Sequence, residues 1–389
     1  MVGFKEQFLS FSKSYNEEQK RIGSHLGIEI VNCSFDSEYS FDFSDKGFVR
    51  GNLFYHELVN RNVAENSHFN YPVVVPDTRL RYESGILLFH GLNERNWDKY
   101  FVWAKYLAEK TQRPVVLFPI AYHMNRAPKA WSNPRMMTEI ANSRKMKDQE
   151  NNSTFANAAL STRLEFHPEL FIYSGLHTCC DVQQFLREIK TGGNELFSAD
   201  AHFDIFSYSI GSFLSQILLL SNPESLFDDT KLFIFCGGPT FDRMNGNSKY
   251  IMDMQAFNSL LTLKHRRRLK AIRRKVIATG DSSLINTWPG LELMMYSKRG
   301  RKKRDDLFGK IGSRIKAIAL EKDKVMPVAG IIETLRGKRN DGTIPVEVID
   351  FPFEYSHEQP FPVGDDKIQS LVDRSFTVVF DKAVSFFNS

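Results

Sequence analysis

Residues 203–212 read FDIFSYSIGS, and the interpretation of the whole chain depends on this stretch. Its apolar first half predicts a strand, and the apolar run 210–220 that follows predicts a helix. Between them stands S-x-S-x-G, one residue away from G-x-S-x-G, the strand–turn–helix elbow that presents a nucleophilic serine. The elbow needs small residues on both sides because strand and helix approach closely; Gly211 meets this need, and Ser207 replaces the usual glycine. Ser209 is therefore either a nucleophile or part of a serine-rich turn.

The composition is that of an ordinary globular protein. Of the 389 residues, 42% are hydrophobic and 25% are charged, and the 33 phenylalanines predict an aromatic core. Residues 1–20 contain no apolar run long enough for a signal peptide, although their spacing predicts a short amphipathic helix. No segment approaches about 18 uninterrupted apolar residues, so we expect a cytoplasmic protein without a membrane span. The cysteines have no C-x-x-C or zinc-ligand spacing, which predicts reduced core thiols and no metal site: Cys33, Cys179, Cys180 and Cys236.

Short apolar, β-rich runs alternate with helical or loop segments over most of the chain. The predicted strands are 85–90, 114–120, 203–209, 231–236, 314–320 and 346–351, and the main predicted helices are 98–109, 171–190, 210–220 and 367–387. This alternation indicates an α/β fold with a mostly parallel sheet covered by helices on both faces.

Three segments depart from the alternation. Residues 1–80 are polar and studded with aromatic residues, and we expect an N-terminal extension with a few antiparallel strands before a core domain at 81–389. The intervals 121–169 and 242–312 are too long for simple loops. Both follow the carboxyl ends of strands, where open α/β sheets bind ligands. We therefore predict that they form cap or lid insertions.

A serine hydroxyl is a poor nucleophile, so its site must also supply a base, a group that orients the base, and oxyanion donors. The triplet His90-Gly91-Leu92 follows an early strand, as the H-G pair of an oxyanion loop does. The backbone N–H groups of Leu92 and Ile210 are the predicted donors. The alternative is a hydrogen-bonded histidine at a strand end.

The candidate acid is Asp323, in the sequence ALEKDKVMP. It lies just past an apolar strand, and one further strand then leads to a histidine loop. An acid there would orient the base and stabilise its imidazolium form. Asp281 and Asp242 are rivals, since each follows an apolar run, and a solvated loop aspartate is the structural alternative.

The candidate base is His357, in the sequence FPFEYSHEQPFP. Ten histidines are available, and this one follows the last predicted strand and precedes the final helix. The alternative is a solvated histidine paired with Glu354 or Glu358.

In the order Ser209, Asp323, His357, the chain resembles the α/β-hydrolase superfamily, as an esterase- or lipase-like branch, over about residues 80–389. The resemblance implies the α/β-hydrolase fold and a serine hydrolase that acts on a small carboxylic ester or related acyl substrate. It also implies an acyl-enzyme intermediate and no metal or organic cofactor. An acyltransferase of the same fold stays open, and so does an inactive binding module, although the filled triad positions argue against the module.

Other residues near these motifs are candidates for contact with the substrate. These are His90, Gly91, Arg95 and Tyr208, although an ion pair with Glu94 or Asp98 is favoured for Arg95. Three residues of the first insertion are expected to line the pocket from above: His123, Arg126 and Trp131.

Most of the net charge of +5 comes from the basic runs 264–275 and 298–304. Such a run is most often a solvated helix face, and we expect no nucleic acid partner. A basic cap that favours an anionic substrate or a membrane surface is the alternative.

Overall fold

The computed structural model describes residues 2–23, 27–41, 58, 60–76, 81–147, 152–337 and 344–389. Parts of the predicted N-terminal extension lie outside the described residues, as does a short piece of the first insertion, 148–151. The predicted boundary at residue 80 is among the positions outside, so the division into an extension and a core stays a prediction.

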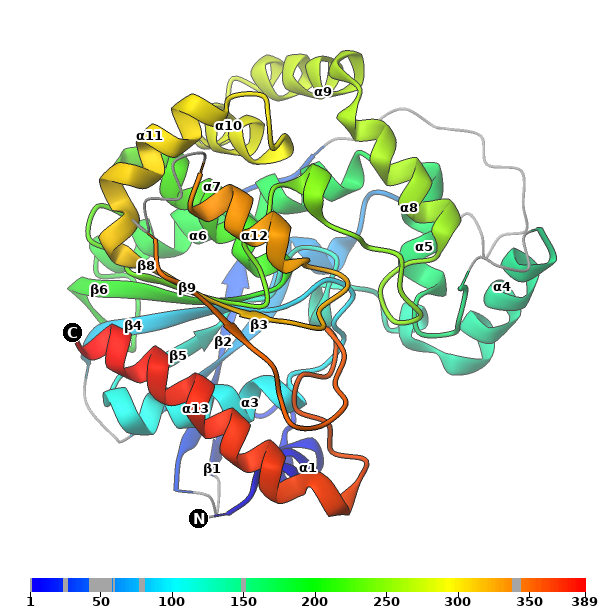
Figure 1. The fold of residues 1–389 in the computed structure, drawn as a ribbon. Coiled ribbons are helices and arrows are strands. Elements are labelled where there is room, and N and C mark those ends of the chain that lie inside the picture. The colour runs from blue at the N-terminus through cyan, green and yellow to red at the C-terminus, as the bar shows by residue number, and fades with distance from the viewer. Residues whose placement is uncertain are drawn as a thin grey trace.

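One mixed sheet runs through the middle of the molecule (Figure 1). Within the described residues it has nine strands in the order β1-β2-β3-β5-β4-β6-β7-β8-β9. The strands are β1 (Arg21–Gly23), β2 (Glu29–Asp36), β3 (His68–Val75), β4 (Tyr82–Phe89), β5 (Val115–Leu117), β6 (Phe197–Tyr208), β7 (Leu232–Phe235), β8 (Ile315–Leu320) and β9 (Val346–Ile349).

The first strands are antiparallel and the rest of the sheet is parallel. β1, β2, β3 and β5 pair antiparallel in succession, whereas β5, β4, β6, β7, β8 and β9 form parallel pairs. β3 and β4 are consecutive in the chain but are not neighbours in the sheet, because β5 lies between them. This mainly parallel sheet, with its crossover and its serine elbow after β6, is the α/β-hydrolase architecture that the resemblance predicts.

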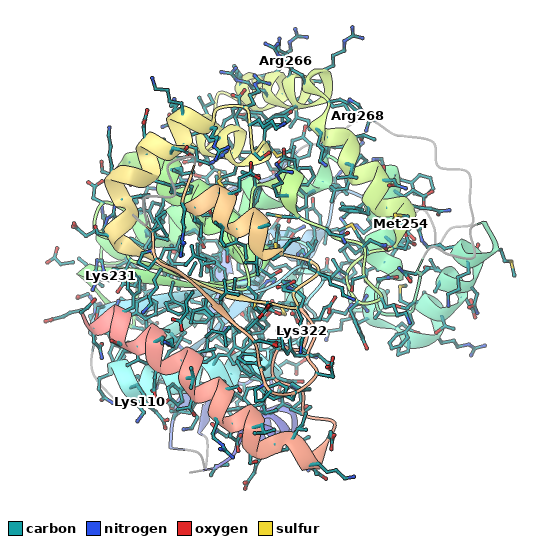
Figure 2. The ribbon with its side chains drawn as sticks, in the orientation of Figure 1. Lys110, Lys231, Met254, Arg266, Arg268 and Lys322 are labelled. Carbon is teal, nitrogen blue, oxygen red and sulfur yellow. The ribbon has the colours of Figure 1, made fainter. Side chains whose placement is uncertain are left out.

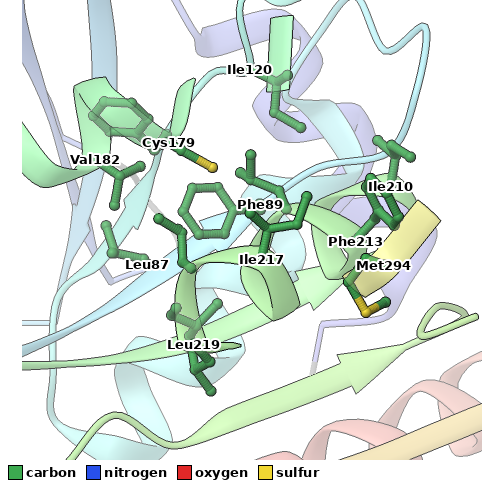
Figure 3. Packing of buried hydrophobic residues seen from close by; sticks show 14 of the residues in the cluster. Leu87, Phe89, Ile120, Cys179, Val182, Ile210, Phe213, Ile217, Leu219 and Met294 are labelled. Atoms are coloured by element: carbon green, nitrogen blue, oxygen red, sulfur yellow. The ribbon is translucent and has the colours of Figure 1, made fainter. Parts of the chain in front are cut away.

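Helices cover both faces of the sheet, as the apolar strands require. On one face lie α1 (Phe4–Ser14), α3 (Asp98–Thr111) and α13 (Gln369–Asn388), and on the other lie α6 (Leu170–Lys190), α7 (Ile210–Ser221) and α12 (Val328–Leu335) (Figure 1). Each predicted helix is present, including the amphipathic one near the N-terminus, where Phe4 and Phe11 are buried. Figure 3 shows the packing on the second face, where Leu87 and Phe89 of β4 lie among Val182 of α6 and Ile217 and Leu219 of α7.

The two long intervals fold into helices on the side of the sheet's carboxyl edge. The first contains α4 (Pro134–Lys147) and α5 (Ala158–Phe166), and the second contains α8 (Met254–Leu261), α9 (Arg266–Ala278), α10 (Ser282–Met295) and α11 (Arg301–Ile311). α5 and α8 lie side by side (Figure 1). A buried ion pair also joins α4 to α8, because Arg144 Nε and Nη2 donate to the carboxylate of Asp253, the residue that caps α8, at 2.5 and 2.8 Å.

The apolar run before the rival Asp281 is helical, so Asp281 does not stand at the end of a strand. Residues 275–278 belong to helix α9, whose buried face carries Leu269, Ile272 and Val276. Asp281 itself caps α10, since its carboxylate accepts a hydrogen bond from the Leu284 N–H. Among the described residues, none of the helices has the length and apolarity needed to cross a membrane.

Candidate active site

The S-x-S-x-G stretch forms a strand–turn–helix elbow between β6 and α7. Ser209 stands at the turn with φ 57° and ψ −123°, a conformation that costs a residue with a side chain of the order of 1–3 kcal/mol. A Cβ at Gly211 would lie 2.7 Å from both Phe89 Cβ and the Phe89 carbonyl oxygen, so only glycine fits there. Ser207 is fully buried, and its hydroxyl lies 3.1 Å from Ser212 Oγ and 3.3 Å from the Phe233 carbonyl oxygen. A strained residue is thus held by close packing on both sides.

The structure brings Ser209, His357 and Asp323 into one hydrogen-bonded chain. Ser209 Oγ lies 2.6 Å from His357 Nε2, and His357 Nδ1 lies 2.7 Å from Asp323 Oδ2. The other carboxylate oxygen, Oδ1, accepts the N–H groups of Val325 and Met326 at 2.8 and 2.9 Å. Asp323 therefore fixes the Nδ1–H tautomer of the histidine and leaves Nε2 as an acceptor for the serine proton.

The two rival aspartates are engaged elsewhere. The carboxylate of Asp242 accepts hydrogen bonds from the backbone N–H and the hydroxyl of Ser297 and from the Thr240 hydroxyl. Asp281 caps α10, as described above. Of the three candidate acids, Asp323 is the one that contacts His357.

The loop that carries His357 is fixed from below by β6 and α3. The Tyr208 hydroxyl donates to the His357 carbonyl oxygen, and the Tyr208 ring stacks on the imidazole with centroids 5.4 Å apart. Lys99 Nζ donates to the Glu358 carbonyl oxygen at 2.9 Å. Burial raises the pKa of Tyr208 well above its ordinary value. The predicted substrate contact of Tyr208 is therefore wrong, because its hydroxyl is used to position the histidine loop.

The residues of the proposed oxyanion donors line an apolar pocket. Ile210 is the first residue of α7, so its N–H has no acceptor within the helix and lies at the positive end of the helix dipole. Leu92 lies in the turn after β4, and both residues line the pocket. The Gly91 N–H is used within the protein, since it donates to the Tyr100 hydroxyl at 3.0 Å.

His90 acts as a structural histidine rather than a substrate contact. Its ring is fully buried, Nδ1 lies 2.8 Å from the Gly91 carbonyl oxygen, and Nε2 accepts the Ile120 N–H at 2.9 Å. Burial and the nearby His123 lower the pKa of His90 well below its ordinary value, which keeps it neutral. Both ring nitrogens are thus occupied in joining the loops after β4 and β5.

Arg95 and Asn93 tie the oxyanion loop to both insertions. Asn93 Nδ2 donates to the carbonyl oxygens of Ala156 at 2.8 Å and Tyr250 at 2.6 Å. Arg95 also donates to the Ala156 carbonyl oxygen, at 2.8 Å. The predicted ion pair of Arg95 with Glu94 or Asp98 is wrong: within the described residues Arg95 pairs with neither, and Glu94 pairs with Lys99 at 2.5 Å.

The pocket between the elbow and the first insertion is almost entirely apolar. It is narrow, and its lining includes Leu92, Ile120, Leu164, Phe171, Ile210, Phe213, Leu214 and Ile217. Of the three residues expected above the site, His123 lines the pocket. Arg126 does not, because it is ion-paired with Asp181 at 2.7 Å, and Trp131 packs behind Arg163.

Sequence reasoning missed Arg163, which lies on α5 and lines the pocket. In the sequence it stands in the run AALSTRLEF with Glu165 close by, so nothing distinguished it from an ordinary ion-paired surface arginine.

The basic runs lie on or near the outer surface and not over the serine. Figure 2 shows Arg266 on α9 at the outer edge of the molecule, and the exposed arginines of this helix form a solvated face opposite its buried apolar residues. In the second run, Arg304 is buried and donates to the carbonyl oxygens of Leu293, Tyr296 and Ser297. The predicted alternative of a basic cap is therefore not supported by these runs.

The thiols and the metal-binding residue types suggest no further chemistry. All four cysteines are unpaired, as predicted, and burial raises the pKa of Cys33 to about 11 and that of Cys236 well above its ordinary value. Within the part of the chain that the structure describes, no group of three or more His, Cys, Asp or Glu side chains is placed to hold a metal ion.

A family model described as "Family of unknown function (DUF6051)" matches residues 21–388. None of the curated proteins matches the sequence. Among solved structures, a thermostable esterase from Pseudomonas putida ECU1011 is similar with 8% identity and a TM-score of 0.47, covering 98% of this chain and 90% of that one. Esterase LipW from Mycobacterium marinum has 10% identity, a TM-score of 0.45, and coverage of 94% and 84%. A bacterial heroin esterase has 10% identity, a TM-score of 0.45, and coverage of 93% and 86%. At identities this low, the activities of these proteins do not extend to the present chain.

Proposed function

Because the chain belongs to the family of unknown function DUF6051, whose description names no activity, we propose its function from its own residues. It is a serine hydrolase that cleaves a carboxylic ester, with Ser209 as nucleophile, His357 as general base and Asp323 as the acid that orients the base. The observation that carries the proposal is the continuous chain of hydrogen bonds, 2.6 Å from serine to histidine and 2.7 Å from histidine to aspartate.

In the proposed reaction, His357 Nε2 takes the proton of Ser209 as Oγ attacks the ester carbonyl carbon. The tetrahedral oxyanion accepts hydrogen bonds from the N–H groups of Leu92 and Ile210. The intermediate collapses when His357 returns the proton to the leaving alcohol, and an acyl-enzyme remains. Water, deprotonated by His357, then releases the carboxylic acid by the same sequence of steps.

The apolar pocket supports an acyl rather than an alcohol assignment for that side of the site. Its lining includes Leu92 and Ile210, the proposed oxyanion donors, so a carbonyl bound by them would lie beside an apolar surface that suits an acyl chain. The burial of such a chain would contribute about 0.8 kcal/mol for each methylene group. We propose that the insertions 121–169 and 242–312 of a core domain at 81–389 together form the cap over this pocket.

A fluorophosphonate probe, which forms a covalent bond with an activated serine, tests the proposal. We expect the wild type to be labelled and Ser209→Ala to be unlabelled. Ser207→Ala is the matched control, because it removes the other serine of the same motif and should still be labelled. A labelled Ser209→Ala protein would exclude Ser209 as nucleophile, whereas a folded but unlabelled wild type would favour a binding module.

A further inference from the structure

Arg163 is a buried cation without a counterion at the wall of the proposed acyl pocket. The side chain is only 3% exposed, and neither Nε nor Nη2 has a hydrogen-bond partner in the protein. Burial lowers its pKa to about 10, which still leaves the guanidinium charged near neutral pH. An unpaired buried charge is costly, so its presence calls for an explanation, and a ligand that supplies the missing partner is one.

Three other buried arginines of this chain have carboxylate or carbonyl partners at their terminal nitrogens, although Nε of Arg126 and of Arg304 has none among the described residues. Arg126 pairs with Asp181 at 2.7 Å, and Arg144 pairs with Asp253 and Glu165 at 2.5 and 2.6 Å. Arg304 donates to three carbonyl oxygens. Arg163 differs from all three because its guanidinium has aromatic contacts but no carboxylate or carbonyl partner in the described part of the chain.

The aromatic contacts of Arg163 hold it while leaving its donors free. Its guanidinium carbon lies 3.9 Å from the centroid of the Trp131 ring and 4.5 Å from that of Tyr122. A guanidinium stacks through its flat faces, whereas its N–H groups point outward in its plane and match the two oxygens of a carboxylate. The stacking therefore pre-orients the donors instead of satisfying them.

A second polar atom on the same pocket lining is also without a partner. His123 Nδ1 lies 3.0 Å from the Ala121 carbonyl oxygen, so Nδ1 carries the proton and the buried, unpartnered Nε2 is an acceptor. Burial lowers the pKa of His123 to about 4, and this keeps the ring neutral. Two unsatisfied polar groups indicate that this part of an otherwise apolar pocket receives a polar ligand group and not a plain alkyl chain.

We propose that the substrate is an ester whose acyl group carries a carboxylate, and that Arg163 binds this carboxylate while the ester carbonyl lies at Ser209. The inference rests on the proposed hydrolase function, because Leu92, Ile210 and Arg163 line one and the same pocket. A dicarboxylic acid monoester has this form, with an apolar chain between its two ends.

The test compares ethyl monoesters of dicarboxylic acids, from succinate to suberate, with their neutral isosteres in which a carboxamide replaces the free carboxylate. Acid release at constant pH gives kcat/KM for each substrate. We expect the wild type to prefer one carboxylate ester of the series over its carboxamide, and Arg163→Met to lower kcat/KM for that ester about ten- to a hundredfold. Arg163→Lys should retain part of the preference.

The ratio of carboxylate to carboxamide turnover within one protein is independent of how much of a variant is folded. A wild type that prefers the carboxamide would overturn the inference, and so would an Arg163→Met variant that loses both activities equally. Arg266→Met is the matched control, since it removes an exposed arginine on α9 and should leave the ratio unchanged.

Failure of the proposed function gives a different result. If the probe does not label Ser209 and no ester is cleaved, the hydrolase proposal fails, and calorimetry with free adipate and glutarate then tests the pocket alone. Binding to the wild type that is lost in Arg163→Met would support the carboxylate site, whereas no binding would overturn it. Labelling at Ser209 and cleavage of neutral esters without any carboxylate preference would overturn this inference only.

Discussion

The two ends of the proposed site, the triad and Arg163, differ in how completely the protein satisfies their polar groups. At the serine end, both oxygens of Asp323 and both nitrogens of His357 have partners within the chain. At the arginine end, Nε and Nη2 of Arg163 and Nε2 of His123 have none. The proposed catalytic groups are oriented by hydrogen bonds within the protein. The groups proposed to recognise the substrate keep hydrogen-bonding capacity that only a ligand can use. The difference therefore separates the residues proposed for chemistry from those proposed for recognition.

The largest effect is expected from a substitution that removes the hydrogen bond between Asp323 and His357. In Asp323→Asn the backbone donors would keep the amide oxygen, so the amide N–H₂ would face His357 Nδ1 and favour the tautomer with its proton on Nε2. That tautomer cannot accept the serine proton, and kcat should fall about 10³- to 10⁴-fold with the fold intact. Asp242→Asn changes the rival aspartate and should keep a rate near that of the wild type. Equal losses in the two variants would contradict the assignment of Asp323.

The next effect concerns the proposed cap, whose helix α5 carries Arg163. Arg144→Met leaves the carboxylate of Asp253 buried without its partner, which should cost about 3–5 kcal/mol of stability in the α4–α5–α8 region. We expect faster proteolysis and hydrogen exchange in the cap, and a raised KM, while the probe still labels Ser209. Arg135→Met removes an exposed arginine of the same helix and should change none of these. A loss of labelling in Arg144→Met would mean that cap and triad are one cooperative unit.

The sequence predicts the satisfied end far better than the other. Strand ends, chain order and a glycine requirement are local features, and they located Ser209, Asp323 and His357 at the carboxyl edge of a correctly predicted sheet. The rival Asp281 was excluded only by the structure, because the run before it has the apolar content of a strand and the length of a helix.

The sequence gives no sign that Arg163 is a recognition residue, and the reason is physical. Arg163 is unusual because its buried Nε and Nη2 have no hydrogen-bond partner within the described residues. This can be recognised only when the positions of all neighbouring residues in the fold are known. Nothing in the sequence shows that Glu165 pairs with Arg144 and not with Arg163, or that Trp131 and Tyr122 come to stack on it. The basic runs are conspicuous in the sequence, but the sequence does not show that most of their charges lie at the surface.

A smaller effect is expected at the elbow, where close packing at Gly211 and not hydrogen bonding holds the backbone of Ser209 in its strained conformation. Gly211→Ala places a methyl group 2.7 Å from Phe89, and relief of this clash should cost about 1–3 kcal/mol and displace the Ile210 N–H. We expect a lower melting temperature together with a lower kcat for all esters, carboxylate or not. Gly309→Ala, on α11 with open space around it, should stabilise the protein slightly. A Gly211→Ala variant as active as the wild type would show that the elbow tolerates a shift of its oxyanion donor.

The smallest effect is expected at Ser207, the residue that departs from the elbow pattern. Its buried hydroxyl makes contacts at 3.1 Å to Ser212 and 3.3 Å to Phe233, and neither partner belongs to the triad. Ser207→Gly should therefore cost about 1 kcal/mol of stability, from a lost hydrogen bond and a more flexible unfolded chain, with little change in kcat. Ser207→Leu is the matched opposite, because a large side chain at a fully buried position must push β6 from α7 and abolish labelling. If Ser207→Gly instead lost most of its activity at unchanged stability, the hydroxyl would belong to the chemistry, and the triad end of the proposed site would contain a fourth polar group.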